Sequence, residues 1–209
     1  MTGLVLKPRR PVAVPNPPDE VFEQLVRQAQ SGNEEAFRRL VERCHTQVYR
    51  WALVRTGDAD DADDVAQDVL VRLSTHLHRY DGRSRFTTWL YRVTANAAGG
   101  FFRRGAARRR MVERLSQRGA DPDTGPADPL GQVHTADLSG LVRAFVDELP
   151  VRQREVLDLA DLQGYAASAI AEMLKIDPAT VRAHLFRARR TLRARMLAEH
   201  PALLEDMKP

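Results

Sequence analysis

Apolar residues recur every three or four positions along most of this chain, and that spacing is typical of amphipathic helices. The clearest short example is the segment 19–32, where one helical face carries Phe22, Leu25, Val26 and Ala29. No segment alternates apolar and polar residues for long enough to form a strand. The sequence therefore predicts an all-α fold.

Residues 19–118 contain four such amphipathic segments separated by short breaks. After the first, Asn33 is placed to cap a second helix, a third follows Gly57, and a fourth begins near Thr87. Their apolar stripes are Phe37, Leu40, Val41, Cys44, Val48, Trp51 and Ala52, then Val65, Val69, Leu70, Leu73 and Leu77, then Trp89, Leu90, Val93 and Ala97. Four helices with short connections predict one compact helical domain.

The remaining segments differ in composition. Residues 1–18 are rich in proline and predict an extended, disordered tail. Residues 119–137 mix Gly, Pro and Asp with few apolar positions, which is typical of a flexible linker. Residues 138–198 are helical again and predict a second, smaller domain, and residues 199–209 form a C-terminal tail.

The last long helix of the second domain has two unlike faces. Asp177 can act as its N-cap and Pro178 suits its first position. One face carries Val181, Leu185, Ala188 and Leu192, and the opposite face carries Arg182, Ala183, Phe186, Arg187 and Arg190. Six arginines and no acidic residue lie between positions 182 and 195. This pattern indicates the second helix of a helix-turn-helix that binds DNA, and the alternative is a solvated basic face.

Charge and composition exclude several other classes of protein. The net charge is only +4, yet residues 58–68 hold six aspartates and residues 103–118 hold seven arginines, which indicates two partners, or two parts of one partner, with opposite charge demands. Cys44 is the only cysteine, so no internal disulfide can form, and its place on an apolar stripe predicts a small buried side chain. We expect a cytoplasmic chain without membrane insertion, because no long apolar run or signal peptide is present.

Enzyme motifs are absent as well. The six histidines have no metal-ligand spacing, and no glycine-rich phosphate loop occurs. The acidic run 60–64 could in principle hold Mg²⁺, but no second acidic cluster accompanies it. We therefore expect no catalytic residues, no metal, no cofactor and no small-molecule substrate.

Three strings in the first domain, together with the helix-turn-helix, carry a family resemblance. They are Ala36-Phe37-Arg38-Arg39-Leu40, Asp61-Ala62-Asp63-Asp64-Val65-Ala66-Gln67-Asp68-Val69-Leu70 and Phe86-Thr87-Thr88-Trp89-Leu90-Tyr91-Arg92-Val93-Thr94-Ala95-Asn96. Over residues 20–196 the chain resembles the extracytoplasmic-function (ECF) group of bacterial RNA polymerase sigma factors, in the sigma-70 family. The resemblance implies two helical domains, regions 2 and 4, which direct core RNA polymerase to promoter DNA and assist promoter opening. It also implies frequent control by an anti-sigma factor.

Carried over residue by residue, the resemblance assigns the acidic helix to core-polymerase binding through Asp64, Gln67, Asp68 and Arg72. The earlier aspartates at 58, 60 and 61 are interpreted as helix-capping residues.

For the minus-10 element, the resemblance implies a pocket for an extruded base at Tyr80, Val93 and Asn96, with the loop 81–86 around it. Around that pocket, Arg83, Arg85, Phe86, Arg103 and Arg104 complete the predicted DNA-binding set, and the triplet 108–110 would follow the backbone of the melted strand. Phe86 and Trp89 could stack on DNA, although their spacing favours the core.

The implied minus-35 readers are Thr180, Arg182, Ala183, His184, Phe186, Arg187 and Arg190. His184 lies off the centre of the predicted DNA face. Two residues depart from the family pattern: Ala166 stands where a Ser or Thr cap is usual, and Lys175 stands where the turn commonly has Gly. The alternative to a sigma factor is a stand-alone helix-turn-helix regulator, which would leave the first domain without a purpose.

Overall fold

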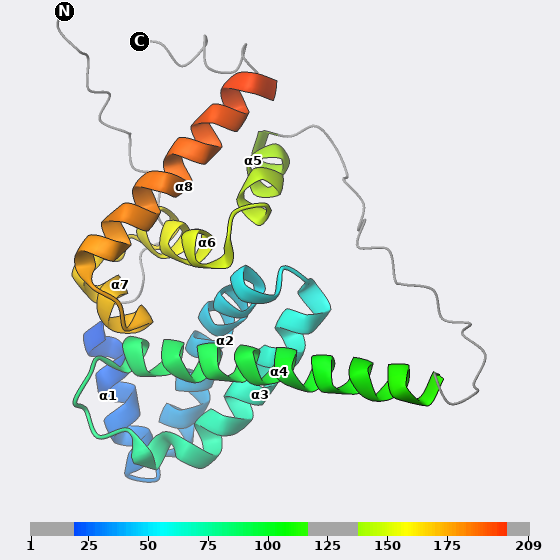
Figure 1. Cartoon of the computed structure of the whole chain (residues 1–209). Helices are drawn as coiled ribbons and strands as arrows, with labels where there is room; N and C mark the ends of the chain where they lie inside the picture. The colour runs from blue at the N-terminus through cyan, green and yellow to red at the C-terminus, as the bar shows by residue number, and fades with distance from the viewer. Residues whose placement is uncertain (1–18, 117–137, 200–209) are drawn as a thin grey trace, which may run out of the picture.

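The computed structural model describes residues 19–116 and 138–199, and within these ranges every regular element is a helix (Figure 1). The elements are α1 (Asp19–Gln30), α2 (Glu34–Thr56), α3 (Ala59–His76), the 3₁₀ turn η1 (Leu77–Arg79), α4 (Phe86–Ser116), α5 (Leu138–Asp147), α6 (Val151–Leu157), the π-helical turn η2 (Asp158–Leu162), α7 (Ala167–Leu174) and α8 (Pro178–Glu199). The all-α prediction is confirmed.

The helix boundaries follow from local capping groups. Asn33 Oδ1 accepts the backbone N–H of Ala36 at 2.9 Å, and Asp58 Oδ1 accepts that of Asp61 at 2.9 Å. Between these two helices Gly57 ends α2 in the left-handed conformation, with φ 76°, which glycine adopts without steric cost. The capping roles that the sequence predicted for Asn33 and Asp58 are confirmed.

Helices α1 to α4 enclose one apolar core. Its largest fully buried side chains include Phe22, Leu40, Trp51, Leu73, Phe86 and Leu90. Cys44 lies fully buried in this core, as predicted. In Figure 1 the long helix α4 lies across α2 and α3, and its C-terminal half extends past them. A cation-rich helix is thereby held out from the bundle.

Helices α5 to α8 form a smaller group around α8. Leu149, Leu157 and Ala188 form one buried cluster, against which Val146, Leu185 and Leu192 pack. Ile170 and Met173 of α7, together with Val181 of α8, are buried in the same cluster as the core of α1 to α4. Helix α7 packs on α4, and α6 packs on α2. The two predicted halves therefore lie in direct contact.

Three predictions lie outside the described residues: the N-terminal tail 1–18, the linker 119–137 and the C-terminal tail beyond residue 199.

Candidate DNA-binding and partner-docking surfaces

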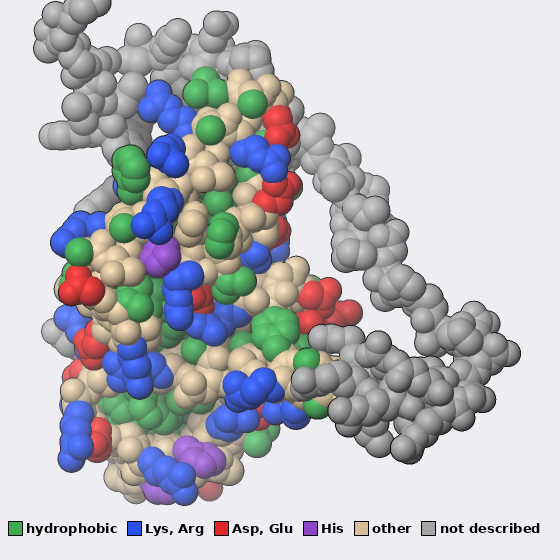
Figure 2. Space-filling view, in the orientation of Figure 1, with side chains coloured by type: hydrophobic (Ala, Val, Ile, Leu, Met, Phe, Trp, Pro, Cys, Tyr) green, Lys and Arg blue, Asp and Glu red, His purple; other side chains and the backbone are tan. Residues whose placement is uncertain are grey.

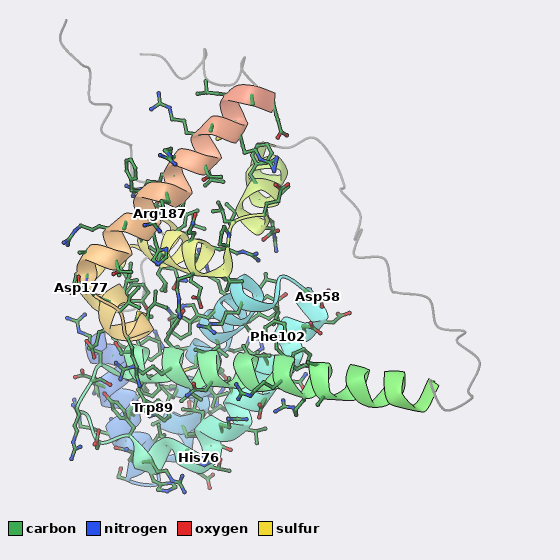
Figure 3. The ribbon with its side chains drawn as sticks, in the orientation of Figure 1. Asp58, His76, Trp89, Phe102, Asp177 and Arg187 are labelled. Carbon is green, nitrogen blue, oxygen red and sulfur yellow. The ribbon has the colours of Figure 1, made fainter. Side chains whose placement is uncertain are left out.

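Helix α8 presents a basic face to solvent. Asp177 Oδ1 accepts the N–H of Ala179 at 2.7 Å, so the helix starts at Pro178, as the sequence predicts. Val181 and Ala188 are buried against the rest of the group. In Figure 2 Lys and Arg side chains gather on the surface over this helix, and Figure 3 labels Asp177 and Arg187 on it.

The predicted minus-35 readers divide by exposure. Thr180, Arg182, Phe186, Arg187 and Arg190 are exposed, while Ala183 and His184 are half-buried. Phe186 is 66% exposed and is flanked by Arg182 and Arg190 one turn away on either side. An arginine fork can hydrogen-bond a guanine edge, and an exposed apolar side chain can contact a thymine methyl group. The exposed face thus carries the side-chain chemistry of major-groove readout.

Two other arginines of α8 are held by acids of the same group. Arg189 Nε lies 3.0 Å from Asp161 Oδ2, and Arg195 pairs with Glu148. Among the described residues no acidic side chain forms an ion pair with Arg182, Arg187 or Arg190. The unneutralised charge therefore lies on the predicted DNA face.

His184 lies at the edge of this face. Its Nδ1 is buried and forms no hydrogen bond within the described part of the chain. Burial lowers the pKa of His184, and the nearby cations Arg187 and Arg152 lower it further. The imidazole is therefore neutral at neutral pH, so its charge contributes nothing to phosphate binding.

The two departures from the family pattern lie at the two ends of α7. Ala166 precedes α7 without a side-chain capping bond. Lys175 adopts the left-handed conformation, with φ 54° and ψ 48°, and is the one non-glycine residue with positive φ among those described. The turn nevertheless keeps the connection between α7 and α8 short.

A second surface lies on the outward face of α3. Asp64 and Gln67 are exposed, whereas Asp68 and Arg72 are half-buried and bind one another. Arg72 donates to both Asp68 oxygens, at 3.0 and 2.9 Å, and Arg104 Nη2 lies 3.9 Å from the same carboxylate. The structure therefore brings the four predicted polymerase-binding residues to one helix.

Sequence reasoning missed Val71, which is 63% exposed on α3, one turn after Gln67. An apolar side chain in the middle of a polar face is a usual anchor of a protein interface. Helical spacing could have found it, because Val71 falls four positions after Gln67, outside the stripe of Val65, Val69 and Leu73.

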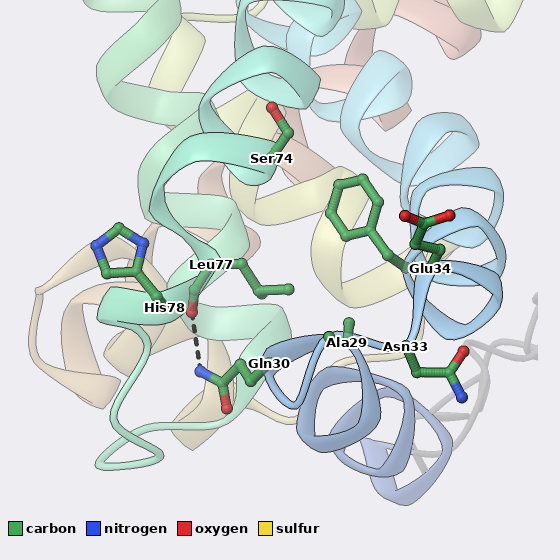
Figure 4. Close-up of a pocket in the computed structure, with 9 residues that line it drawn as sticks. Ala29, Gln30, Asn33, Glu34, Ser74, Leu77 and His78 are labelled. Atoms are coloured by element: carbon green, nitrogen blue, oxygen red, sulfur yellow. Dashed lines mark hydrogen bonds between the residues drawn. The ribbon is translucent and has the colours of Figure 1, made fainter.

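The loop before α4 is tied to α1 and to itself. Gln30 Nε2 donates to the carbonyls of Leu77 and Tyr80, both at 2.9 Å. The first of these bonds joins two residues that line the pocket drawn in Figure 4. Tyr80 Oη donates to the Ser84 carbonyl at 2.7 Å. Arg83 and Arg85 remain exposed on the loop. The loop is thereby held in one shape with its cations outward.

Phe86 requires a correction. The side chain is only 1% exposed and packs against Phe22, Tyr80 and Trp89, with ring centroids 5.5 to 5.7 Å apart. It cannot contact DNA in this conformation, so its predicted DNA-binding role is replaced by a core role. The helical spacing of Phe86 predicted this core role, and the alternative, stacking on DNA, is wrong for this side chain.

A surface pocket of about 400 Å³ lies between the end of α3 and α4, lined by Arg72, His76, Arg79, Trp89, Val93 and Asn96. It contains Val93 and Asn96, two of the three predicted base-pocket residues, but not Tyr80. Figure 3 labels two of its lining residues, Trp89 on α4 and His76 at the end of α3. An indole wall, an amide and several cations match the needs of an unstacked nucleotide.

The basic end of α4 continues from this pocket. Arg103 and Arg104 are exposed on it, and the side chains of the triplet 108–110 lie outside the described residues.

The comparisons with known proteins agree on one family. The model of sigma-70 region 2 matches residues 40–119, and the model of sigma-70 region 4 matches residues 139–192. The ECF RNA polymerase sigma factor SigM of Mycobacterium tuberculosis is 34% identical over 177 residues, covering 80% of each chain.

Solved structures show the same fold. CnrH, solved with the cytosolic domain of CnrY, matches with a TM-score of 0.60 at 25% identity and covers 86% of this chain and 99% of that chain. The sigma factor RpoE of Bartonella quintana, solved with the anti-sigma factor NepR, matches with a TM-score of 0.56 at 20% identity, over 78% of this chain and 98% of that chain.

No helix in the described ranges is long and apolar enough to cross a membrane. The family models, the relatives and the helix-turn-helix agree, and the chain belongs to the ECF group of sigma-70 family RNA polymerase sigma factors.

Proposed function

We propose that the two helical groups divide the work of this sigma factor. Residues 19–118 act as region 2, which binds core polymerase and the minus-10 element, and residues 138–198 act as region 4, which binds the minus-35 element. The chain supplies recognition and strand opening and has no catalytic residues of its own. Because core polymerase works in the bacterial cytoplasm, the proposal also implies a cytoplasmic location.

The observation that carries this proposal is that one chain presents two unlike polar surfaces. The α3 face offers exposed carboxylate and amide groups at Asp64 and Gln67. The α8 face offers arginines that no acidic side chain in the described part of the chain neutralises. A stand-alone regulator would need only the second surface. An acidic docking face and a basic reading face in one chain fit a protein that joins polymerase to DNA.

The pocket between α3 and α4 supports the region 2 assignment. We assign the extruded base of the minus-10 element to this pocket, with Trp89 as its stacking wall and the Asn96 amide at its polar edge. Arg79 would lie near a flanking phosphate. Because RpoE of Bartonella quintana was solved with an anti-sigma factor, we include a protein inhibitor of that class among the partners.

The test is reconstitution with bacterial core RNA polymerase, followed by transcription from promoters selected from genomic fragments. Asp64→Ala with Gln67→Ala should weaken binding to core, and Glu42→Ala on α2 is the control for the loss of an exposed carboxylate.

Arg187→Ala should weaken binding to the minus-35 element by about 1–3 kcal/mol if Arg187 hydrogen-bonds a base, and Arg43→Ala is its control. Failure to bind core, combined with tight duplex binding by the free chain, would favour the stand-alone regulator.

A further inference from the structure

His76 is the last residue of α3 and lines the pocket between α3 and α4 (Figure 3). The side chain is half-buried. Its Nδ1 lies 3.2 Å from the Arg72 carbonyl oxygen and 2.6 Å from Thr75 Oγ1. These two contacts on one ring nitrogen fix the orientation of the imidazole at the edge of the pocket.

The same contacts determine which ring nitrogen carries the proton. A carbonyl oxygen only accepts hydrogen bonds, so Nδ1 must donate to the Arg72 carbonyl. Thr75 Oγ1 donates its own proton to the Val71 carbonyl at 3.1 Å, and it therefore presents a lone pair to Nδ1 as well. Because a neutral imidazole carries one proton, Nε2 is an acceptor. Within the described residues no hydrogen bond reaches Nε2.

Asn96 supplies the amide of this pocket, and its polarity is adaptable. A side-chain amide offers a donor and an acceptor, and a half-turn of the group exchanges the two. Asn96 can therefore pair with base edges of either polarity. His76 cannot adapt in this way, because turning its ring would break the bond from Nδ1 to the Arg72 carbonyl. The pocket thus combines one fixed acceptor with one adaptable amide.

The four bases differ in what they would present to a fixed acceptor. Cytosine N4 and adenine N6 are amino groups that donate hydrogen bonds, whereas thymine O4 and guanine O6, at the corresponding positions, are acceptors. An amino group facing Nε2 gains a hydrogen bond. A carbonyl oxygen in the same place sets one lone pair against another, and both acceptors then lack a donor. The polarity of the pocket therefore suits cytosine and adenine.

We propose that His76 determines the base specificity of this pocket: its Nε2 accepts a hydrogen bond from the exocyclic amino group of the extruded base and selects cytosine or adenine over thymine and guanine. The inference rests on the proposed function, which assigns the extruded base to this pocket. Trp89 offers stacking that every base can use, so it contributes affinity without this preference. Arg79 faces phosphate, which has the same chemistry beside every base.

The experiment uses the holoenzyme formed by the full chain and core polymerase, with forked promoter DNA. The non-template strand is left unpaired across the minus-10 element, so that the strength of base pairing does not affect binding. At each position of the element, adenine is replaced by purine and cytosine by pyrimidin-2-one, and each replacement deletes only the exocyclic amino group. Thymine and guanine are placed at the same positions.

Three variants are compared with the unsubstituted chain. His76→Ala removes the acceptor, and His76→Gln replaces it with an amide that can turn. His78→Ala is the matched control, because it removes an exposed histidine two positions further on, which does not line this pocket. Affinities for two bases are compared as a ratio within each holoenzyme, so a general loss of folding or of core binding cancels.

In the unsubstituted and His78→Ala holoenzymes, deleting the amino group at one position of the element should weaken binding about tenfold. Thymine or guanine at that position should weaken it at least as much. In His76→Ala the deletion should have no effect. His76→Gln should bind cytosine and thymine equally well, since its amide can accept from one and donate to the other.

A second measurement needs no polymerase. Long-range ¹H–¹⁵N correlation spectra of the free chain, recorded above neutral pH, show which ring nitrogen of His76 carries the proton, and His76→Gln assigns the signals. A proton on Nδ1 is the expected result. A proton on Nε2 would overturn the inference, because that nitrogen could then not accept from a base.

A holoenzyme that prefers thymine or guanine at every position of the element would also overturn it, and so would an amino-group effect that persists in His76→Ala. Base-dependent binding that is indifferent to His76 therefore defeats this inference alone. If no holoenzyme forms, or if it binds the forks without regard to the minus-10 bases, the proposed function fails and the inference fails with it.

Discussion

Lys175 ends α7 in a left-handed backbone conformation, where a side chain is unfavourable. Its φ of 54° and ψ of 48° fall in the αL region. The N–H of Ile176 donates to the Ala171 carbonyl at 3.0 Å, which is the 6→1 bond of a Schellman motif that favours glycine at Lys175. The Lys175 side chain is exposed. Replacing it by glycine therefore removes backbone strain with little loss of packing.

The expected gain can be worked out from two opposing effects. A residue with a Cβ in this conformation costs about 1–2 kcal/mol. Glycine recovers this cost but loses about 0.5–1 kcal/mol through the greater freedom of the unfolded chain. We predict that Lys175→Gly raises the free energy of unfolding by about 0.5–1 kcal/mol. With a urea dependence of about 2 kcal/mol/M, the midpoint should rise by about 0.3–0.5 M.

The assay is urea unfolding of the full chain followed by far-UV circular dichroism. Lys175→Ala is the control, because alanine keeps the Cβ and its strain while losing the lysine side chain. It should therefore stay close to the unsubstituted chain. If Lys175→Gly were no more stable than Lys175→Ala, the strain argument would be refuted.

Four further outcomes follow from the same structure. Ala166→Ser should supply the missing cap of α7 and raise the free energy of unfolding by about 1 kcal/mol in the same urea assay; no gain would mean that the α7 N-terminus is already satisfied. Phe86→Ala should lower the free energy of unfolding by about 3–5 kcal/mol, because it truncates a core side chain; unchanged stability together with lost DNA binding would instead support a direct DNA contact by Phe86. Cys44, whose thiol pKa burial raises, should resist Ellman's reagent at pH 8 until urea is added, and rapid labelling of the folded chain would contradict its burial. His184 should titrate by NMR with a midpoint below its ordinary value of 6.5, so it stays neutral through pH 7; a midpoint at or above that value would contradict its burial.

Local chemistry made the helices predictable. Asn33, Asp58 and Asp177 each precede an apolar stripe, and each accepts a backbone N–H of the first helical turn in the structure. Capping depends on residues within three positions of one another, so the sequence contains all the information that it needs. The exposed arginine face of α8 was predictable for the same reason, since helical periodicity alone separates it from the Val181 stripe.

The pocket between α3 and α4 was only partly predictable. Val93 and Asn96 lie on one helix at a spacing of three, so the sequence could place them together. Arg72, His76 and Arg79 come from the preceding elements, and their approach depends on how α3 packs against α4. Tyr80 instead packs on Phe86 and Trp89, because the loop folds back toward α1 through Gln30.

The interface between the regions shows why such contacts escape sequence reasoning. Glu155 and Asp158 lie beside the apolar stripe of α6, where charged residues normally face solvent. Their partners Arg50 and Arg55 are about a hundred residues earlier, and no periodicity links the two segments. The π-helical turn at Asp158–Leu162 also shifts the side-chain register from that of a continuous α-helix. Burial of the two carboxylates therefore depends on the contact between region 2 and region 4, which no local pattern of residues encodes.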